Sequence, residues 1–173
     1  MDAAEKFVAR DRNNLVTGLI ERQSGGPMSS DTGAQPTWVN NVINGYPALS
    51  FFSANGATNG QNLRFTLGSG AVSTMTGRPI AIFAVAAITA SSARYGNTIV
   101  DIGSLTNPNP GCLVWTGTND GKLVSARYVN DDTNDLTAEV AIDTNFHVYT
   151  FLYDGQNIIL RIDGVQKKAK LCV

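Results

Sequence analysis

The stretch that decides the fold is FHVYTFLYDGQNIILRIDG, from Phe146 to Gly164. Its first half alternates with a period of two, which indicates a β-strand packed on both faces. Asp154-Gly155 and Asp163-Gly164 interrupt the pattern, because glycine adopts the positive φ of a tight turn. Ile158–Ile162 then forms a second strand and Val165–Val173 a third, so the sequence predicts a C-terminal β-meander. The first strand has two faces: His147, Tyr149, Phe151 and Tyr153 on one, and Val148, Thr150 and Leu152 on the other.

Short strand signals continue through the rest of the chain, separated by turn residues at intervals of roughly ten residues. Pro79–Thr89 is a continuous apolar run, and its length and flanking residues favour a central strand. Ser24–Gln35, Asn55–Asn62 and Ser69–Arg78 have loop compositions. The sequence therefore predicts an all-β, antiparallel two-sheet sandwich. One further strand is expected to begin near Trp38. The other expected strands are Ala48–Phe52, Leu63–Leu67, Thr98–Ile102, Gly111–Trp115, Leu123–Val129 and Leu136–Ile142.

Composition limits the partners. The 173 residues carry a formal net charge of −1, which gives no electrostatic reason to expect nucleic acid or an anionic membrane. From Gln23 to Ala93 the charged residues are Asp31, Arg64 and Arg78. The polar surface there must consist of hydroxyls, amides and glycine. Such a surface suits proteins that meet sugars, and it is also ordinary in β-rich domains.

Residues 1–22 differ from the rest because eight of them are charged. Asp2 followed by Glu5 is a capping-box pattern, which predicts a short helix. One interpretation is an arm that docks on a partner or a neighbouring subunit. The other is a terminal strand and helix folded onto the domain's own surface. We therefore divide the chain into an N-terminal helical or extended arm and linker, residues 1–34, and a β-sandwich, residues 35–173.

The charged start shows no secretory signal, which predicts synthesis in a cytoplasm without a signal peptide. The longest apolar run, Ile80–Ile88, is too short to span a bilayer. Cys112 and Cys172 are the two cysteines. In such a chain, free and buried thiols are favoured over a disulfide between them.

The hairpin His147–Gly155 followed by Ile158–Gly164 resembles that of concanavalin A-like lectin/glucanase (LamG-type) jelly rolls, especially bacterial and phage members. Gln35–Val39, Ile43–Phe51 and Pro79–Val85 resemble the strands that precede it in that family. The resemblance implies a jelly-roll sandwich over roughly residues 35–170 and says little about function, because the family includes lectins, hydrolases, lyases and structural modules.

The chain ends soon after this hairpin, whereas family members continue with a closing strand. The missing strand could come from the N-terminal 35 residues or from a neighbouring subunit, or the sheet edge could stay open. An open apolar edge favours association with other chains. We therefore expect a homo-oligomer, or binding to other proteins of a viral assembly, through residues 1–22 or an open sheet edge.

Catalytic signatures are weak. A glycosidase needs paired carboxylates. Glu139 and Asp143 are the pair in this sequence that comes closest to that pattern, because a spacing of four residues would place both side chains on one face of a strand. The clustered motifs of the family's lyases are not present. His147 is the sole histidine, and its place at the start of a core strand favours a structural, hydrogen-bonded role over that of a general base. We predict that the chain is not an enzyme.

Two polar loops are candidate binding sites. Six oxygen-bearing side chains in Asn130–Asp135 suit calcium, and such clusters also make ordinary turns; no other cofactor is indicated. Glycan binding needs an exposed aromatic ring beside amides or carboxylates, and Trp38, Tyr46 and Tyr95 are possible rings, although both tryptophans are favoured as core anchors. The carbohydrate candidates are Trp115, Asn119, Asp120 and Tyr128, and the metal candidates are Asn130, Asp131, Asp132 and Asp135.

These features predict a non-enzymatic structural or decoration protein on the surface of a larger assembly, a phage virion being the setting that the family resemblance suggests. The alternative is a carbohydrate-binding module or adhesin that recognises cell-surface glycans.

Overall fold

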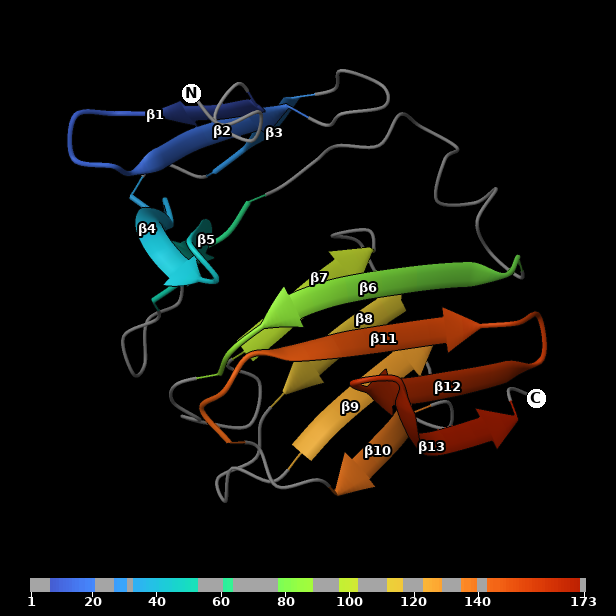
Figure 1. Cartoon of the computed structure of the whole chain (residues 1–173). Helices are drawn as coiled ribbons and strands as arrows, with labels where there is room; N and C mark the ends of the chain where they lie inside the picture. Colours follow the sequence, from blue (N-terminus) through green and yellow to red (C-terminus); the bar gives the residue numbers. More distant parts are fainter. Residues whose placement is uncertain are drawn as a thin grey trace. The chain divides into compact units, whose positions relative to one another are not determined.

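The computed structural model of this chain describes residues 7–20, 27–30, 33–52, 61–63, 78–88, 97–102, 112–116, 123–128, 135–139 and 143–171. Within these ranges the regular elements are β-strands and no α-helix occurs, so the all-β prediction is confirmed (Figure 1). The chain divides into two compact units, Met1–Leu67 and Gly68–Val173. This division falls well after residue 34, where the sequence suggested a boundary.

The first unit contains a small sheet and a separate hairpin. The sheet has the antiparallel order β1-β2-β3, and the hairpin pairs β4 with β5. β3 lies inside Ser24–Gln35, so the prediction of a loop is wrong at that point. Its proline is the first residue of the strand, a position at which proline is tolerated in sheets. The strand bounds are β1 Val8–Arg10, β2 Val16–Ile20, β3 Pro27–Ser29, β4 Thr37–Ile43 and β5 Tyr46–Ser50.

The segment predicted as an arm is hydrogen-bonded to the start of β4. The Val16 N–H donates to the Pro36 carbonyl at 2.8 Å, and the Trp38 N–H donates to the Asn14 carbonyl at 2.9 Å. Val16 and Pro36 are fully buried. Residues 8–20 therefore take the second of the two predicted arrangements, a strand folded onto its own unit. The capping box of Asp2 and Glu5 lies outside the described residues.

Trp38 anchors this unit. Its side chain is 7 % exposed, and its indole N–H donates to Asn40 Oδ1 at 2.7 Å. The guanidinium of Arg10 lies 4.7 Å from the centre of a Trp38 ring, a cation–π contact. The prediction that Trp38 is a core anchor is confirmed. The Asn44-Gly45 turn between β4 and β5 is confirmed as well, with φ values of 50° and 82°.

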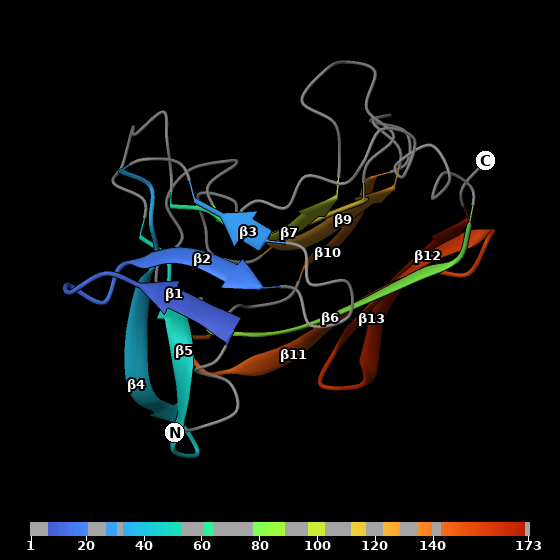
Figure 2. The same ribbon diagram turned by 90° about the horizontal axis from the view of Figure 1, so that it is seen from above.

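The second unit contains two four-stranded antiparallel sheets. One has the order β13-β12-β11-β6 and the other β10-β9-β8-β7 (Figures 1 and 2). Cα atoms of β9 and β10 lie within 8 Å of Cα atoms in β12 and β13, so the two sheets approach each other inside this unit. The strand bounds are β6 Ile80–Ala86, β7 Asn97–Ile102, β8 Cys112–Thr116, β9 Leu123–Tyr128, β10 Asp135–Glu139, β11 His147–Tyr153, β12 Asn157–Ile162 and β13 Val165–Leu171.

The predicted meander is confirmed, and one of its faces forms the described core of this unit. β11 pairs with β12, and β12 with β13, through the turns at Asp154-Gly155 and Asp163-Gly164. The opposite face of β11 is covered unevenly: Thr150 is buried, Leu152 is half-buried and Val148 is 40 % exposed. Packing on both faces therefore holds for only part of the strand. The buried residues of β11 and β12 are Tyr149, Phe151, Tyr153, Ile158, Leu160 and Ile162.

The apolar run at Pro79–Thr89 forms a strand, β6, as predicted; its predicted central position is not seen among the described strands. β6 pairs with β11 and is the last strand in the described order of its sheet. Its residues alternate between half-buried Ile82 and Ala84 and exposed Phe83 and Val85. A run that is apolar on both faces suggested burial on both faces, whereas this strand has one half-buried face and one exposed face.

Candidate functional site

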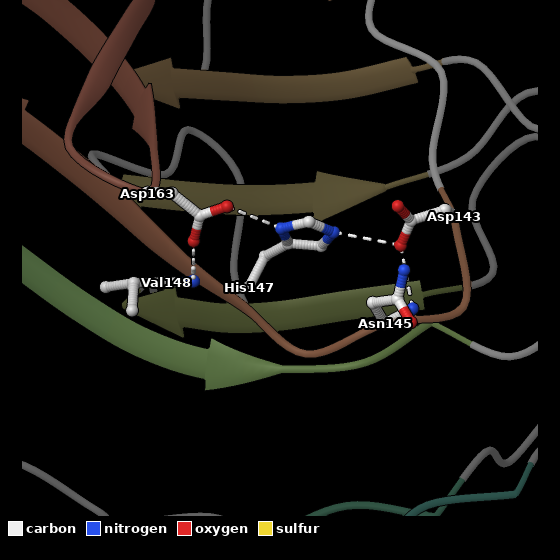
Figure 3. A network of polar contacts seen from close by, with 5 residues as sticks. All are labelled: Asp143, Asn145, His147, Val148 and Asp163. Atoms are coloured by element: carbon white, nitrogen blue, oxygen red, sulfur yellow. Dashed lines mark hydrogen bonds and ion pairs between the residues drawn. The ribbon is translucent and has the colours of Figure 1, made fainter.

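The described part of the chain brings two carboxylates, Asp143 and Asp163, to the imidazole of His147 (Figure 3). His147 is the first residue of β11, Asp143 lies in the segment that precedes this strand, and Asp163 lies in the turn between β12 and β13. Asp163 has a φ of 51° and Gly164 a φ of 76°, which is the geometry of a tight two-residue hairpin turn. This turn places Asp163 beside the start of β11.

Both ring nitrogens of His147 are bound to a carboxylate. Nδ1 lies 2.6 Å from Asp163 Oδ2 and Nε2 lies 2.9 Å from Asp143 Oδ1. An ionised carboxylate can only accept a hydrogen bond. With both aspartates ionised, both nitrogens of His147 must donate, which makes the ring an imidazolium cation. Each contact is therefore a charge-assisted hydrogen bond, which is stronger than a neutral one.

Backbone hydrogen bonds hold the two carboxylates in place. Asp163 Oδ1 accepts the Val148 N–H at 2.8 Å, and the Asp163 N–H donates to the Val148 carbonyl at 2.9 Å. Asp143 Oδ1 also accepts the Asn145 N–H at 2.7 Å. The His147 clamp, consisting of Asp143, His147 and Asp163, thus fastens the segment before β11 and the β12–β13 turn to the start of β11.

The electrostatics agree with this geometry. The pKa of His147 is raised, first by its hydrogen bond to Asp163 and then by that to Asp143, while partial burial opposes the rise. The pKa values of Asp143 and Asp163 are lowered, in each case chiefly by the hydrogen bond to His147. The ring of Tyr149 meets the imidazole edge-on, with 6.2 Å between centroids, and burial raises the pKa of its hydroxyl.

This arrangement is suited to structure rather than to proton transfer. A general base needs a neutral imidazole with a free lone pair that reaches the substrate, and here both nitrogens are engaged. The His147 side chain is 23 % exposed, and those of Asp143 and Asp163 are 56 % and 52 % exposed. The hydrogen-bonded histidine expected from the sequence is therefore present.

The predicted Glu139–Asp143 carboxylate pair does not lie on one strand. β10 ends at Glu139, and Asp143 lies beyond it, bound to His147. The assumption that a spacing of four keeps both side chains on one strand face is therefore wrong. Over the described ranges, no group of three or more His, Cys, Asp or Glu side chains is arranged to hold a metal ion.

The predicted carbohydrate and calcium residues are placed only in part. Trp115 belongs to β8, where it pairs with Ser125, and Tyr128 closes β9, where it pairs with Cys112. Asp135 begins β10, opposite Arg127. The remaining candidates lie outside the described residues: Asn119, Asp120, Asn130, Asp131 and Asp132. Cys172 lies outside them as well.

The two partners of His147 were not predicted, although one of them was within reach of the sequence. The Asp154-Gly155 turn pairs Tyr153 with Ile158. Counting from that pair, backward along the first strand and forward along the second, places His147 opposite Gly164, next to Asp163. Asp143 carries no comparable signal, because it lies in an irregular segment whose path no strand register fixes.

Comparisons of the chain with protein-family models, curated proteins and solved structures give no match. The likeness to concanavalin A-like domains therefore stays a prediction based on the hairpin residues. Among the described residues, no helix is long and apolar enough to cross a membrane.

Proposed function

We propose that this chain is a non-enzymatic structural protein on the surface of a larger assembly, with Gly68–Val173 folded as a concanavalin A-like jelly-roll sandwich. The observation that carries the non-enzymatic part is the His147 clamp. His147 is the chain's one histidine, and histidine is the side chain that most readily exchanges protons near neutral pH. Its two nitrogens are occupied by Asp143 and Asp163.

The sandwich is supported by the arrangement of the second unit. It has two antiparallel sheets of four strands whose strands approach each other within the unit. The face of the meander that carries Phe151 and Leu160 is buried, as the inner face of a two-layer fold would be.

Assembly is supported by apolar residues that the described surface leaves exposed. Phe83, Val85 and Val148 are 69 %, 60 % and 40 % exposed. They lie next to one another, because Val85 of β6 pairs with Val148 of β11. Large exposed apolar groups of this kind are typical of surfaces that contact other proteins.

Purified phage particles whose genome encodes this sequence provide the test. Mass spectrometry is expected to find the chain in the particles, and antibodies raised against it are expected to label intact particles in electron micrographs. Absence of the chain from particles, with the free protein left in the lysate, would refute the proposed setting.

Glycan binding is a second candidate, and the β4–β5 hairpin favours it. Tyr46 is 63 % exposed and follows the Asn44-Gly45 turn, with Asn40 and Asn41 also exposed on the same hairpin. An exposed aromatic ring beside amides is the combination that sugar recognition requires.

An array of bacterial surface polysaccharides, read with and without calcium, tests this candidate. A specific hit that Tyr46→Ala abolishes and Tyr46→Phe retains would establish a stacking site on this hairpin. A hit that only Trp115→Ala abolishes would place the site on β8 instead. A blank array for the folded protein would eliminate glycan binding to these polysaccharides.

A further inference from the structure

We propose that β6 is the strand through which two copies of this chain pair, antiparallel and about a twofold axis at Phe83, so that their β13-β12-β11-β6 sheets join into one. The inference goes beyond the proposed function and does not depend on it. A dimer of this kind could form in any setting.

The two outer strands of this sheet differ in charge. β13 carries Lys167, Lys168 and Lys170, and lysines on an outer strand discourage pairing with other chains. β6, with the sequence IAIFAVA, carries no charge. Two β13 strands brought together would place like charges side by side, whereas two β6 strands meet without that repulsion.

The backbone of β6 is placed to accept another strand. Among the described strands, β11 is the one to which β6 is hydrogen-bonded; β7 comes near it but belongs to the other sheet. An antiparallel strand directs every second N–H and C=O away from a given neighbour, so β6 can accept a further strand on the side away from β11. A second strand would satisfy these groups.

The side chains of β6 favour a second copy as the occupant. Antiparallel pairing about Phe83 places Ile80 opposite Ala86, Ala81 opposite Val85, and Ile82 opposite Ala84. Each of these pairs joins a larger side chain to alanine, so the strand is complementary in volume to its own reverse. Phe83 faces its symmetry mate, and pairs of aromatic rings across strands are stabilising. A twofold interface requires such self-complementarity.

The exposure pattern agrees with this register. Phe83 and Val85 point to the exposed face, and Ala81 is exposed as well. A twofold axis perpendicular to the sheet keeps these residues on the same face in both copies. The two Phe83 rings, each 69 % exposed in the single chain, would cover part of each other.

Light scattering on the eluate of a size-exclusion column tests the dimer. The wild-type chain is expected to elute with twice its mass of 18.4 kDa. Phe83→Lys is expected to raise the dissociation constant by about a hundredfold or more, because it removes the aromatic pair and sets two like charges opposite each other. Leu171→Lys is the matched control: it introduces lysine at a 57 % exposed leucine of β13 and should leave the dimer intact.

Crosslinking gives a second measurement that does not depend on weakening the dimer. Phe83→Cys is expected to form an intermolecular disulfide on mild oxidation, identified as an 83–83 link by mass spectrometry, because directly opposite residues lie within disulfide reach. Ala81→Cys should form no 81–81 link, since four residue steps separate it from its mate, about 13 Å. A monomeric wild-type chain at every soluble concentration, or a dimer unchanged by Phe83→Lys, would overturn the proposal and leave the proposed function standing.

Discussion

Replacing Leu160 with alanine tests whether the buried face of the meander is the core of the second unit. Leu160 lies in β12, pairs with Phe151 of β11 and Lys168 of β13, and is fully buried. The substitution removes a buried isobutyl group between two paired strands and leaves a cavity that the sheet cannot easily close. Leu→Ala changes at such sites cost about 2–5 kcal/mol in the free energy of unfolding. We expect about 3 kcal/mol for Leu160→Ala.

Leu171→Ala is the control, with the same chemical change on the neighbouring strand. Leu171 is 57 % exposed, so only 43 % of its surface (100 − 57) is buried. Complete burial of a leucine side chain is worth about 1.5–3 kcal/mol. The control should therefore lower the free energy of unfolding by about 1 kcal/mol or less.

Urea denaturation followed by circular dichroism measures both variants. The prediction is a difference of about 2 kcal/mol between them at equal slopes of the unfolding transition. Equal losses for the two variants, or a loss below about 1 kcal/mol for Leu160→Ala, would refute the assignment of this face to the core.

Two further predictions concern the His147 clamp and the turn that carries Asp163. The pKa of His147 is raised above 6.5, and those of both aspartates are lowered below 3.8. The wild-type chain should therefore exceed His147→Gln in unfolding free energy by the largest amount between pH 3.8 and pH 6.5. This difference should decline as pH rises through the raised pKa or falls through the lowered ones; a pH-independent difference in urea titrations would contradict the clamp. Gly164→Ala should cost about 1 kcal/mol, because its φ is 76° while the space around an added Cβ is open, and an unchanged urea midpoint would contradict the turn geometry.

The C-terminal meander could be predicted because its information is local. The alternation from His147 to Tyr153 identifies a strand, and Asp154-Gly155 and Asp163-Gly164 identify the turns that connect it to its neighbours. The same local signals found β7 to β10, within a few residues at their ends. Strand pairing across short turns follows directly from such signals.

The position of β6 could not be predicted in this way. Its order in the sheet depends on pairing with β11, more than sixty positions later in the chain, and an apolar run does not state which neighbours it will have. The path of residues 8–20 could not be predicted from local signals either, because their hydrogen bonds to Pro36 and Trp38 join segments that are distant in the sequence. The histidine clamp was half predictable, because a hairpin register locates Asp163 and no register locates Asp143.

The most direct test of the central claim, that the chain's one imidazole is a structural cation and not a catalytic base, is an NMR titration of His147. A chain with one histidine gives one set of imidazole signals, so their assignment needs no variant. We predict a pKa raised above the ordinary value of a histidine, because the carboxylates of Asp163 and Asp143 stabilise the cation. A pKa at or below the ordinary value of 6.5 would contradict the account.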